Sequence, residues 1–328
     1  MEKVTVLGAG SWGTALSMVL AENGHDILLW TNREDQVLEI NEQHTNSQYV
    51  QNIVLPESLK ATNDLSVAVN HGDTIVVAVP TKAIREVCGN LNDVLLTKKL
   101  FVHVSKGIEP DSLMRISEII KETVKPELLS DIVVLSGPSH AEEVSRDKMS
   151  YLTVACTDDD NSRIIGGCFS TPKLHIQYSK DIYGIEYAGI LKNIYALAGG
   201  IATGLGYGDN FRAVLTAASA QEMTRFIQES YPFDRNTMEY AYLGDLLVTS
   251  YSSFSRNRRL GQLIGHGCTV KSALNEMTMI AEGYFASECI RHINDRHGIS
   301  MPIADMVYDV LYRRANPRKR MRELRTQL

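Results

Sequence analysis

Three glycines near the start of the chain have the spacing of a nucleotide-binding turn. The run GAGSWG at residues 8–13 follows a β-branched segment and precedes an apolar one. In this pattern Gly8 permits a tight turn, Gly10 lets the backbone approach a pyrophosphate, and Gly13 lets the following helix pack on the strand. Unpaired N–H groups at the helix N-terminus favour an anion there. The pattern predicts a dinucleotide site, and a glycine turn without a ligand is the alternative.

The end of the second predicted strand bears on the choice of cofactor. NAD-binding turns are commonly followed, about 20 residues later, by a carboxylate that binds the ribose hydroxyls. Here the apolar run 27–30 leads instead to Asn32 and Arg33. Arg33 can pair with a 2′-phosphate, so the sequence favours NADP. Glu34 and Asp35 lie close by, and a solvated Arg33 at the start of the next helix is the alternative.

Polar groups and glycines also follow two later strands, predicted at residues 100–105 and 132–136. Ligands of open parallel sheets bind beyond the carboxyl ends of the strands. Lys106 would extend a cation over the cofactor site, while Gly137 and Ser139 would offer N–H groups to a substrate oxygen. Taken singly, each of these residues also fits a cap or a surface position.

The second half of the chain contains three further candidates for chemistry. Lys192 lies in an otherwise apolar helical pattern, where a lysine is costly to bury unless it has a task or a partner. Asp245 and Thr249 are four residues apart and therefore share one helical face. The run SRNRR at residues 255–259 places three arginines and an amide in one turn, which fits a phosphate clamp or a solvated basic turn.

The elements that must position these residues change in type along the chain. Up to about residue 180, short apolar runs alternate with amphipathic stretches, a pattern typical of a parallel sheet covered by helices. We expect strands at 3–7, 27–30, 74–79, 100–105, 132–136, 151–156 and 174–177, and helices at 82–95, 111–122, 139–147 and 160–169. Later we expect helices at 186–199, 210–230, 240–248, 271–294 and 304–313. The predicted fold class is α/β, with a Rossmann-type, mostly parallel sheet domain (residues 1–185) followed by an all-α-helical domain (residues 186–328).

Composition narrows the class of protein. A chain of 328 residues with 44% hydrophobic residues fits a two-domain enzyme, and a net charge of −6 argues against nucleic acid as a partner. No long apolar run and no leader are present, so we expect a cytoplasmic protein.

The basic stretch after residue 312 contains Pro317 and few apolar residues, which argues against stable membrane insertion. Five scattered cysteines indicate reduced thiols and no metal site.

Together the motifs resemble one family over nearly the whole chain, the bacterial NAD(P)-dependent sn-glycerol-3-phosphate dehydrogenases. Besides the glycine turn, the resemblance rests on SKG at 105–107, SGPS at 136–139, LKN at 191–193, GYGDN at 206–210, GDL at 244–246, SRNRR at 255–259 and IAEG at 280–283. It implies reversible reduction of dihydroxyacetone phosphate by NAD(P)H. The product would feed glycerophospholipid synthesis.

The resemblance also implies roles for individual residues. Lys192 would be the catalytic acid/base, assisted by Lys106 and Asp245. The implied substrate contacts are Lys106, Gly137, Ser139, Lys192, Asn193, Asp245, Thr249, Ser255, Arg256 and Asn257. The implied contacts to the cofactor, which is NADP or NAD with NADPH favoured, are Gly8, Gly10, Ser11, Trp12, Gly13, Asn32, Arg33, Lys106, Ala141, Arg256, Ile280 and Glu282. We expect a homodimer, the commonest assembly of soluble enzymes.

The expected chemistry agrees with these roles. Lys192 would give a proton to the alkoxide that forms at C2, while Lys106 lowers its proton affinity and Asp245 raises it. The chain departs from the family at residues 217–219, which read Ala-Ala-Ser where Thr-Arg-Gly is common, and at Tyr242, where glycine is usual. A paralogue acting on another phosphorylated ketone is therefore an alternative. A β-hydroxyacid or 6-phosphogluconate-type dehydrogenase and a catalytically silent nucleotide sensor are two others.

Overall fold

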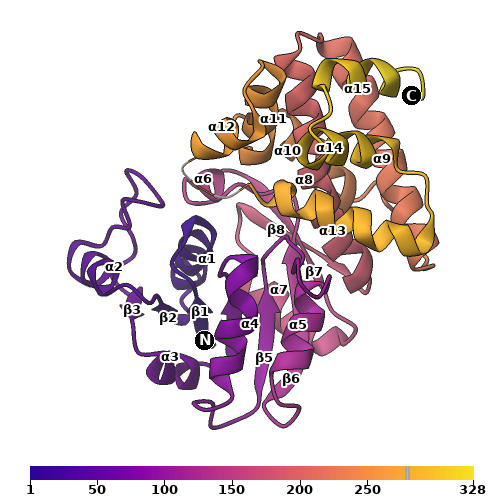
Figure 1. The fold of residues 1–328 in the computed structure, drawn as a ribbon. Coiled ribbons are helices and arrows are strands. Elements are labelled where there is room, and N and C mark those ends of the chain that lie inside the picture. The colour runs from indigo at the N-terminus through magenta and orange to yellow at the C-terminus, as the bar shows by residue number, and fades with distance from the viewer. Residues whose placement is uncertain (278, 280) are drawn as a thin grey trace. The chain divides into compact units, whose positions relative to one another are not determined.

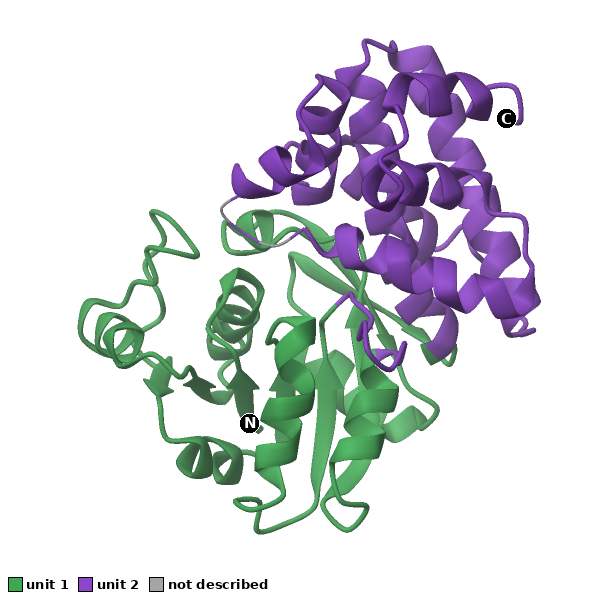
Figure 2. Ribbon diagram, in the orientation of Figure 1, with its two compact units in different colours: residues 1–105, 116–182 green, residues 106–115, 183–328 purple. Residues whose placement is uncertain are grey.

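The computed structural model describes residues 1–277, 279 and 281–328 (Figure 1). These residues form two compact units (Figure 2). Unit 1 contains Met1–Ser105 and Ile116–Ile182, and unit 2 contains Lys106–Arg115 and Tyr183–Leu328. The chain therefore enters unit 2 for one short segment and returns to complete unit 1 before it continues into the rest of unit 2.

Unit 1 is built on one eight-stranded sheet. Its strands are β1 (Lys3–Leu7), β2 (Asp26–Trp30), β3 (Lys60–Thr62), β4 (Thr74–Val77), β5 (Lys99–His103), β6 (Leu129–Ser136), β7 (Ser150–Ala155) and β8 (Leu174–Ser179). They lie in the order β3-β2-β1-β4-β5-β6-β7-β8. Every neighbouring pair is parallel except β6 and β7. The expected mostly parallel sheet is thus confirmed.

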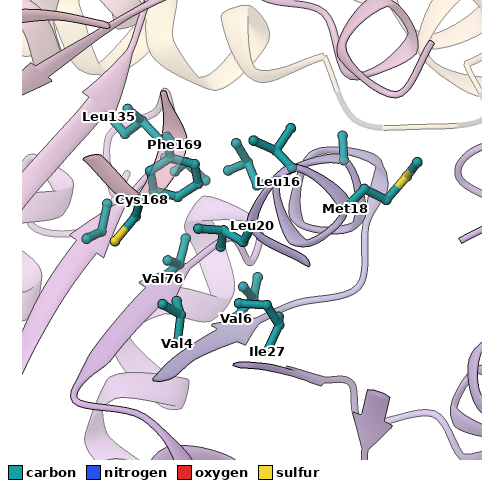
Figure 3. Packing of buried hydrophobic residues seen from close by; sticks show 14 of the residues in the cluster. Val4, Val6, Leu16, Met18, Leu20, Ile27, Val76, Leu135, Cys168 and Phe169 are labelled. Atoms are coloured by element: carbon teal, nitrogen blue, oxygen red, sulfur yellow. The ribbon is translucent and has the colours of Figure 1, made fainter. Parts of the chain in front are cut away.

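Helices cover this sheet and complete its core. They are α1 (Ser11–Glu22), α2 (Glu34–Leu38), α3 (Leu65–His71), α4 (Thr81–Leu91), α5 (Ile116–Thr123), α6 (Ala141–Val144) and α7 (Asp159–Phe169), with a π-helical turn, η1 (Glu39–Gln43). In Figure 3, Val6 of β1, Leu16 and Leu20 of α1 and Phe169 of α7 belong to one buried cluster. This packing fixes the start of α1 at the carboxyl end of β1, where a parallel sheet binds its ligands.

Unit 2 is helical, as the loss of β-branched runs predicts. Its helices are α8 (Ile182–Gly204), α9 (Asp209–Ser230), α10 (Asp245–Tyr251), α11 (Arg256–Gly265), α12 (Val270–Asn275), α13 (Glu282–His297), α14 (Pro302–Tyr312) and α15 (Pro317–Leu324), with a π-helical turn, η2 (Tyr240–Gly244). Among the helices of the described residues, none is long and apolar enough to cross a membrane.

Glycines bring the backbones of α8 and α11 into direct contact. A Cβ on Gly200 of α8 would lie 2.1 Å from a backbone oxygen of α11, and a Cβ on Gly261 of α11 would lie 2.2 Å from a backbone oxygen of α8. Gly204 and Gly265, one turn further along each helix, repeat this reciprocal arrangement. No side chain fits at such a crossing. The four glycines therefore fix the start of α11 relative to the helix that carries Lys192.

Several predicted helices differ from the structure. The helix expected at 139–147 covers only α6, and the one expected at 240–248 begins as the π-helical turn η2 before α10. The helix expected at 271–294 is wrong, because α12 ends at Asn275 and α13 begins at Glu282. Gly283 packs against α8 so closely that a Cβ would lie 2.6 Å from a backbone oxygen, a tertiary contact that periodicity along the chain does not encode. The helix expected at 111–122 begins only at Ile116, because the residues before it form a loop closed by a β-bridge.

Candidate functional site

The three glycines of the turn in unit 1 have different surroundings. Gly8 has a φ of 111°, and a Cβ there would lie 2.8 Å from the Ala78 oxygen. A Cβ on Gly13 would lie 1.9 Å from the Gly8 oxygen, whereas nothing lies within 4 Å of the Cβ position of Gly10. Backbone conformation and packing therefore require Gly8 and Gly13. Gly10 leaves open space at the start of α1, as the approach of a pyrophosphate requires.

The N-terminus of α1 is well suited to bind an anion. Gly10 is its N-cap and contributes no capping side chain, and no acidic residue lies in the first turn. The Ser11 hydroxyl donates to the Tyr49 carbonyl, at 3.0 Å, and Trp12 packs on the hydrophobic core. Because the first N–H groups of a helix have no partner within it, this end attracts a phosphate.

Two buried polar residues that the sequence did not single out brace this turn. Gln36 and Asn46 both donate to the Ala9 carbonyl, at 2.7 and 3.0 Å, and Gln36 also donates to the Asn46 amide oxygen. Asn46 further donates to the Thr14 hydroxyl at 2.8 Å. Neither residue belongs to a motif, since each reaches the turn from a segment distant in sequence. No sequence signal indicates them.

Arg33 lies just after β2 and binds to its own neighbours. Its guanidinium donates to both carboxylate oxygens of Asp35, at 3.2 and 2.5 Å, and to Gln48 at 2.5 Å. The hydrogen bond from Arg33 lowers the pKa of the Asp35 carboxyl. Arg33 and Asn32 are exposed. A 2′-phosphate at this position would therefore compete with Asp35 for Arg33.

The segment after β6 contains the remaining candidates of unit 1. Gly137 has a φ of 141°, and a Cβ there would lie 2.8 Å from the Tyr151 oxygen. The Ser139 hydroxyl donates to the Gly137 carbonyl at 3.2 Å. Ala141 is the first residue of the short helix α6 and is buried. Gly137 thus occupies a position that L-residues adopt only with strain.

In unit 2, the structure brings together four of the residues singled out in the sequence. Lys192 on α8 donates to Asp245 Oδ1 at 2.5 Å and to the Thr249 hydroxyl at 2.9 Å. Lys106 donates to the other carboxylate oxygen of Asp245, at 2.7 Å. The Thr249 hydroxyl in turn donates to the Asp245 backbone carbonyl at 2.7 Å. One carboxylate therefore holds two ammonium groups, with a hydroxyl beside one of them.

Each partner of this cluster is placed by its helix or segment. Lys192 is buried in the middle of α8, between Leu191 and Asn193. Asp245 begins α10 and is 1% exposed, and Thr249 follows one turn later. The departure from the family at Tyr242 lies in η2, directly before α10, where its side chain is buried. Ser219, the last of the three divergent residues on α9, is also buried.

Burial and charge together set the protonation of this cluster. Burial lowers the pKa of Lys192 to about 7, because desolvation disfavours the ammonium; Asp245 opposes that change, and Lys106 adds to it. Burial also disfavours an ionised Asp245, but Lys106 and Lys192 outweigh it and hold the pKa of the carboxyl below its usual value. The cluster therefore contains an ionised Asp245 and a lysine that exchanges its proton near neutral pH.

A chain of buried amides adjoins the lysines. Asn193 donates to the Lys106 carbonyl at 3.2 Å and accepts a hydrogen bond from the Asn257 amide at 2.9 Å. The Asn257 oxygen accepts from the backbone N–H of Gly283, also at 2.9 Å. Asn193 and Asn257 therefore tie α8, α11 and α13 together. The resemblance to the family implies that these two residues contact the substrate, and nothing in the sequence indicates that they join three helices.

The basic run 255–259 forms the N-cap and first turn of α11. The buried Ser255 is the N-cap, and its hydroxyl accepts from the backbone N–H of Arg258 at 3.3 Å. Arg256, the first residue of the helix, is exposed. Glu282 is the first residue of α13, and Ile280 lies outside the described residues. Within the described chain, no three His, Cys, Asp or Glu side chains gather as a metal site requires.

Known proteins similar to this chain share both units. Residues 3–162 match the family NAD-dependent glycerol-3-phosphate dehydrogenase N-terminus, and residues 181–322 match the corresponding C-terminus family. Glycerol-3-phosphate dehydrogenase [NAD(P)+] of Lysinibacillus sphaericus is 48% identical over 97% of this chain and 94% of its own length, and that of Staphylococcus carnosus is 42% identical over 95% and 94%. The crystal structure of glycerol-3-phosphate dehydrogenase from Coxiella burnetii, 30% identical, superposes with a TM-score of 0.92 over 98% of both chains.

Proposed function

The chain belongs to the NAD-dependent glycerol-3-phosphate dehydrogenase family, and from that premise we propose how its residues reduce dihydroxyacetone phosphate to sn-glycerol 3-phosphate. The reversible reaction adds a hydride to C2 of the ketone and a proton to the C2 oxygen. NADH or NADPH supplies the hydride. The observation that carries the proposal is the buried cluster of Lys192, Asp245 and Lys106, because reducing a carbonyl requires a positioned proton donor.

Lys192 is the proposed proton donor. A general acid works best when its pKa lies near the working pH, since it must both give up and regain a proton. With a pKa of about 7, the Lys192 ammonium meets that condition, which a solvated lysine does not. In the reverse direction, neutral Lys192 accepts the proton of the C2 hydroxyl. The same residue thus serves both directions.

Asp245, Thr249 and Lys106 complete the proposed catalytic group. Asp245 holds both lysines, and Thr249 accepts from Lys192 while its own proton is directed to the backbone, which orients the ammonium. Lys106 places a second positive charge beside the carboxylate. That charge lowers the proton affinity of Lys192 and can stabilise the oxyanion that develops on the ketone.

The first turn of α11 is the proposed phosphate site. Arg256 is exposed at the first helical position, next to the unpaired N–H groups of the helix N-terminus. Its guanidinium can bind two phosphate oxygens at once. Ser255 and Asn257 flank it, with Asn193, Gly137 and Ser139 as the further proposed substrate contacts. Binding energy from the phosphate then orients C2 for reduction.

For the cofactor, we propose that the glycine turn binds the pyrophosphate and that NADPH is preferred over NADH. The proposed contacts are Gly8, Gly10, Ser11, Trp12, Gly13, Asn32, Arg33, Lys106, Ala141, Arg256, Ile280 and Glu282. Support for the turn comes from the open space at Gly10 and the uncapped start of α1. Support for NADPH is the arginine after β2, in a place where NAD enzymes commonly have a carboxylate.

A spectrophotometric assay of Lys192→Met tests the proposal. With dihydroxyacetone phosphate and NADPH or NADH, we expect the wild type to turn over and the variant to lose at least about 100-fold in kcat, because its proton donor is gone. Cofactor binding, followed by fluorescence titration, should change little. Lys99→Met removes another buried lysine, one that pairs with Asp73 on unit 1, and should keep its activity.

The same assay separates the alternatives. A nucleotide sensor would bind the cofactor without turnover in the wild type. A dehydrogenase of β-hydroxyacids or of another phosphorylated ketone would oxidise NADPH with its own substrate faster than with dihydroxyacetone phosphate. If Lys192→Met kept more than about a tenth of the wild-type kcat, Lys192 would not be the acid/base.

We further propose that the enzyme is a homodimer that acts in the cytoplasm. All five cysteines, each in the described part of the chain, are unpaired, which suits a reducing compartment. A two-fold dimer is the commonest assembly of soluble enzymes. Light scattering after gel filtration gives the mass in solution, and a monomeric mass at micromolar concentration would exclude the dimer.

A further inference from the structure

We propose that Arg115 and Glu186 are positioning residues that hold Lys106 in place beside Asp245; this inference rests on the proposed function. Lys106 and Arg115 are the two ends of the short segment of unit 2 that interrupts unit 1 in the sequence. Because the chain on either side of the segment belongs to unit 1, its place in unit 2 depends on contacts that it makes there.

The segment is closed on itself, so its two ends are coupled. Ile108 and Arg115 form an antiparallel β-bridge. Inside the bridge, the Glu109 N–H donates to the Met114 carbonyl at 3.0 Å. Ile108 is 2% exposed and therefore anchored as well. Since Lys106 is only two residues before Ile108, the position of Arg115 constrains the position of the lysine.

Arg115 is itself held by a buried ion pair. Its Nη1 donates to Glu186 Oε2 at 2.5 Å, and the two side chains are 11% and 3% exposed. The Arg115 guanidinium carbon lies 4.7 Å from the centre of the Tyr183 ring and 5.9 Å from that of Tyr187. Stacking on aromatic rings adds a cation–π attraction to the pair. Removing either side chain breaks this buried ion pair, and losses of that kind are destabilising.

One face of α8 binds both ends of the segment. Glu186, Gly189 and Asn193 have the spacing i, i+3 and i+7, so they lie on one stripe of the helix. Glu186 binds Arg115, and Asn193 donates to the Lys106 carbonyl at 3.2 Å. A Cβ on Gly189 would lie 3.4 Å from Lys106 Cγ, so this position keeps space for the lysine. The helix that carries Lys192 therefore also fixes Lys106.

The β-bridge and the Arg115–Glu186 ion pair together form a clamp on the segment that carries Lys106. The consequence of this clamp is electrostatic. The groups that face Lys192 are Asp245 on α10, Lys106 of the clamped segment and the Thr249 hydroxyl. Of these, only Lys106 brings a like charge. If the clamp is lost, Lys106 can swing away from Asp245, and the repulsion that favours neutral Lys192 disappears. Loss of Arg115 should therefore raise the pKa of Lys192, and this effect passes through Lys106.

The test is the pH titration of Lys192 in ligand-free protein, followed by NMR of lysine labelled at Cε. In Arg115→Met we expect its pKa to rise by about half a unit or more, within the range that one nearby charge produces. Lys106→Met should shift it in the same direction. The double variant should shift it no further than Lys106→Met alone, because both changes remove the same interaction. In Arg115→Lys, the pKa of Lys192 should lie between its values in Arg115→Met and in the wild type.

A control is Arg320→Met on α15, which breaks ion pairs with Asp309 and Glu323 in the same unit and should leave the titration of Lys192 unchanged. Should Arg115→Met fail to fold, Arg115→Lys and Glu186→Gln provide the same comparison. A wild-type titration in Arg115→Met, or a shift that adds fully to that of Lys106→Met, would overturn the proposal. Since the titration needs no turnover, a wild type without dehydrogenase activity would refute the proposed function alone.

Discussion

At the scale of single residues, Lys192 is a charge kept where charges are costly. Asp245 reduces that cost by pairing with the ammonium, as the resemblance to the family implies. What the sequence did indicate was the lysine itself, since an isolated cation in an apolar pattern is unusual. The sequence could not show that Asp245 also holds Lys106, because that pairing joins residues 139 positions apart.

Arg33 provides a test of cofactor choice at the same scale. Arg33→Asp should lower the ratio of kcat/KM for NADPH over NADH, because a carboxylate after β2 repels the 2′-phosphate and accepts from ribose hydroxyls. Asp35→Asn should raise the ratio, since it releases a guanidinium that Asp35 now binds. Arg163→Asp changes an arginine of unit 1 that is 74% exposed and should leave the ratio unchanged. An unchanged ratio in Arg33→Asp would place Arg33 outside the adenosine site.

At the scale of elements, the sequence predicted strands better than helix ends. Seven of the eight strands of unit 1 appear in the sequence as short apolar runs, whereas β3 has only three residues, Lys60–Thr62, and gives no such signal. The sequence predicts one helix where the structure has α12 and α13, because the apolar spacing continues past the end of α12 and does not show the close approach of Gly283 to α8. Likewise, the crossing of α8 and α11 depends on the two G-x-x-x-G spacings, at Gly200 with Gly204 and at Gly261 with Gly265, and only the structure shows that they face each other.

The glycine turn yields a prediction that separates folding from binding. Gly13→Ala should lower the thermal stability strongly, since its Cβ would overlap the Gly8 oxygen at 1.9 Å. Gly10→Ala should fold normally, because its φ of −74° suits alanine and the space is open, and yet bind NADPH more weakly. Gly167→Ala on α7, also in open space, serves as the control for both readouts. Thermal melting and cofactor titration provide the data. Unchanged NADPH affinity in Gly10→Ala would contradict the assigned role.

At the scale of the whole molecule, burial of the Lys192 ammonium lowers the stability of the fold. Burial keeps the pKa of Lys192 at about 7, against an ordinary value of 10.5, so the folded chain holds this proton less tightly than the unfolded chain does. Between those two pH values the unfolded chain therefore binds more protons, and the contribution of Lys192 to the free energy of unfolding becomes more favourable as pH rises. Glu222, whose pKa burial raises to about 7, acts in the opposite direction between its ordinary value of 4.5 and about 7.

Comparing the wild type with Lys192→Met isolates the contribution of the lysine, because Glu222 is present in both. The free energy of unfolding of the wild type, relative to the variant, should rise with pH from about 7 to about 10.5 and level off on either side. The slope cannot exceed about 1.4 kcal/mol per pH unit, the limit for one proton. Urea denaturation at several pH values measures it. A difference that is constant with pH would show that Lys192 titrates normally.

The most direct test of Lys192 as the proton donor is the pH dependence of hydride transfer in both directions, measured in single turnovers from about pH 5.5 to about pH 9. Reduction of dihydroxyacetone phosphate needs protonated Lys192, so its rate should fall as pH rises through about 7. Oxidation of glycerol 3-phosphate needs the neutral amine, so its rate should rise through the same pH. Two profiles that are flat across this range, or that change in the same direction, would show that Lys192 is not the proton donor.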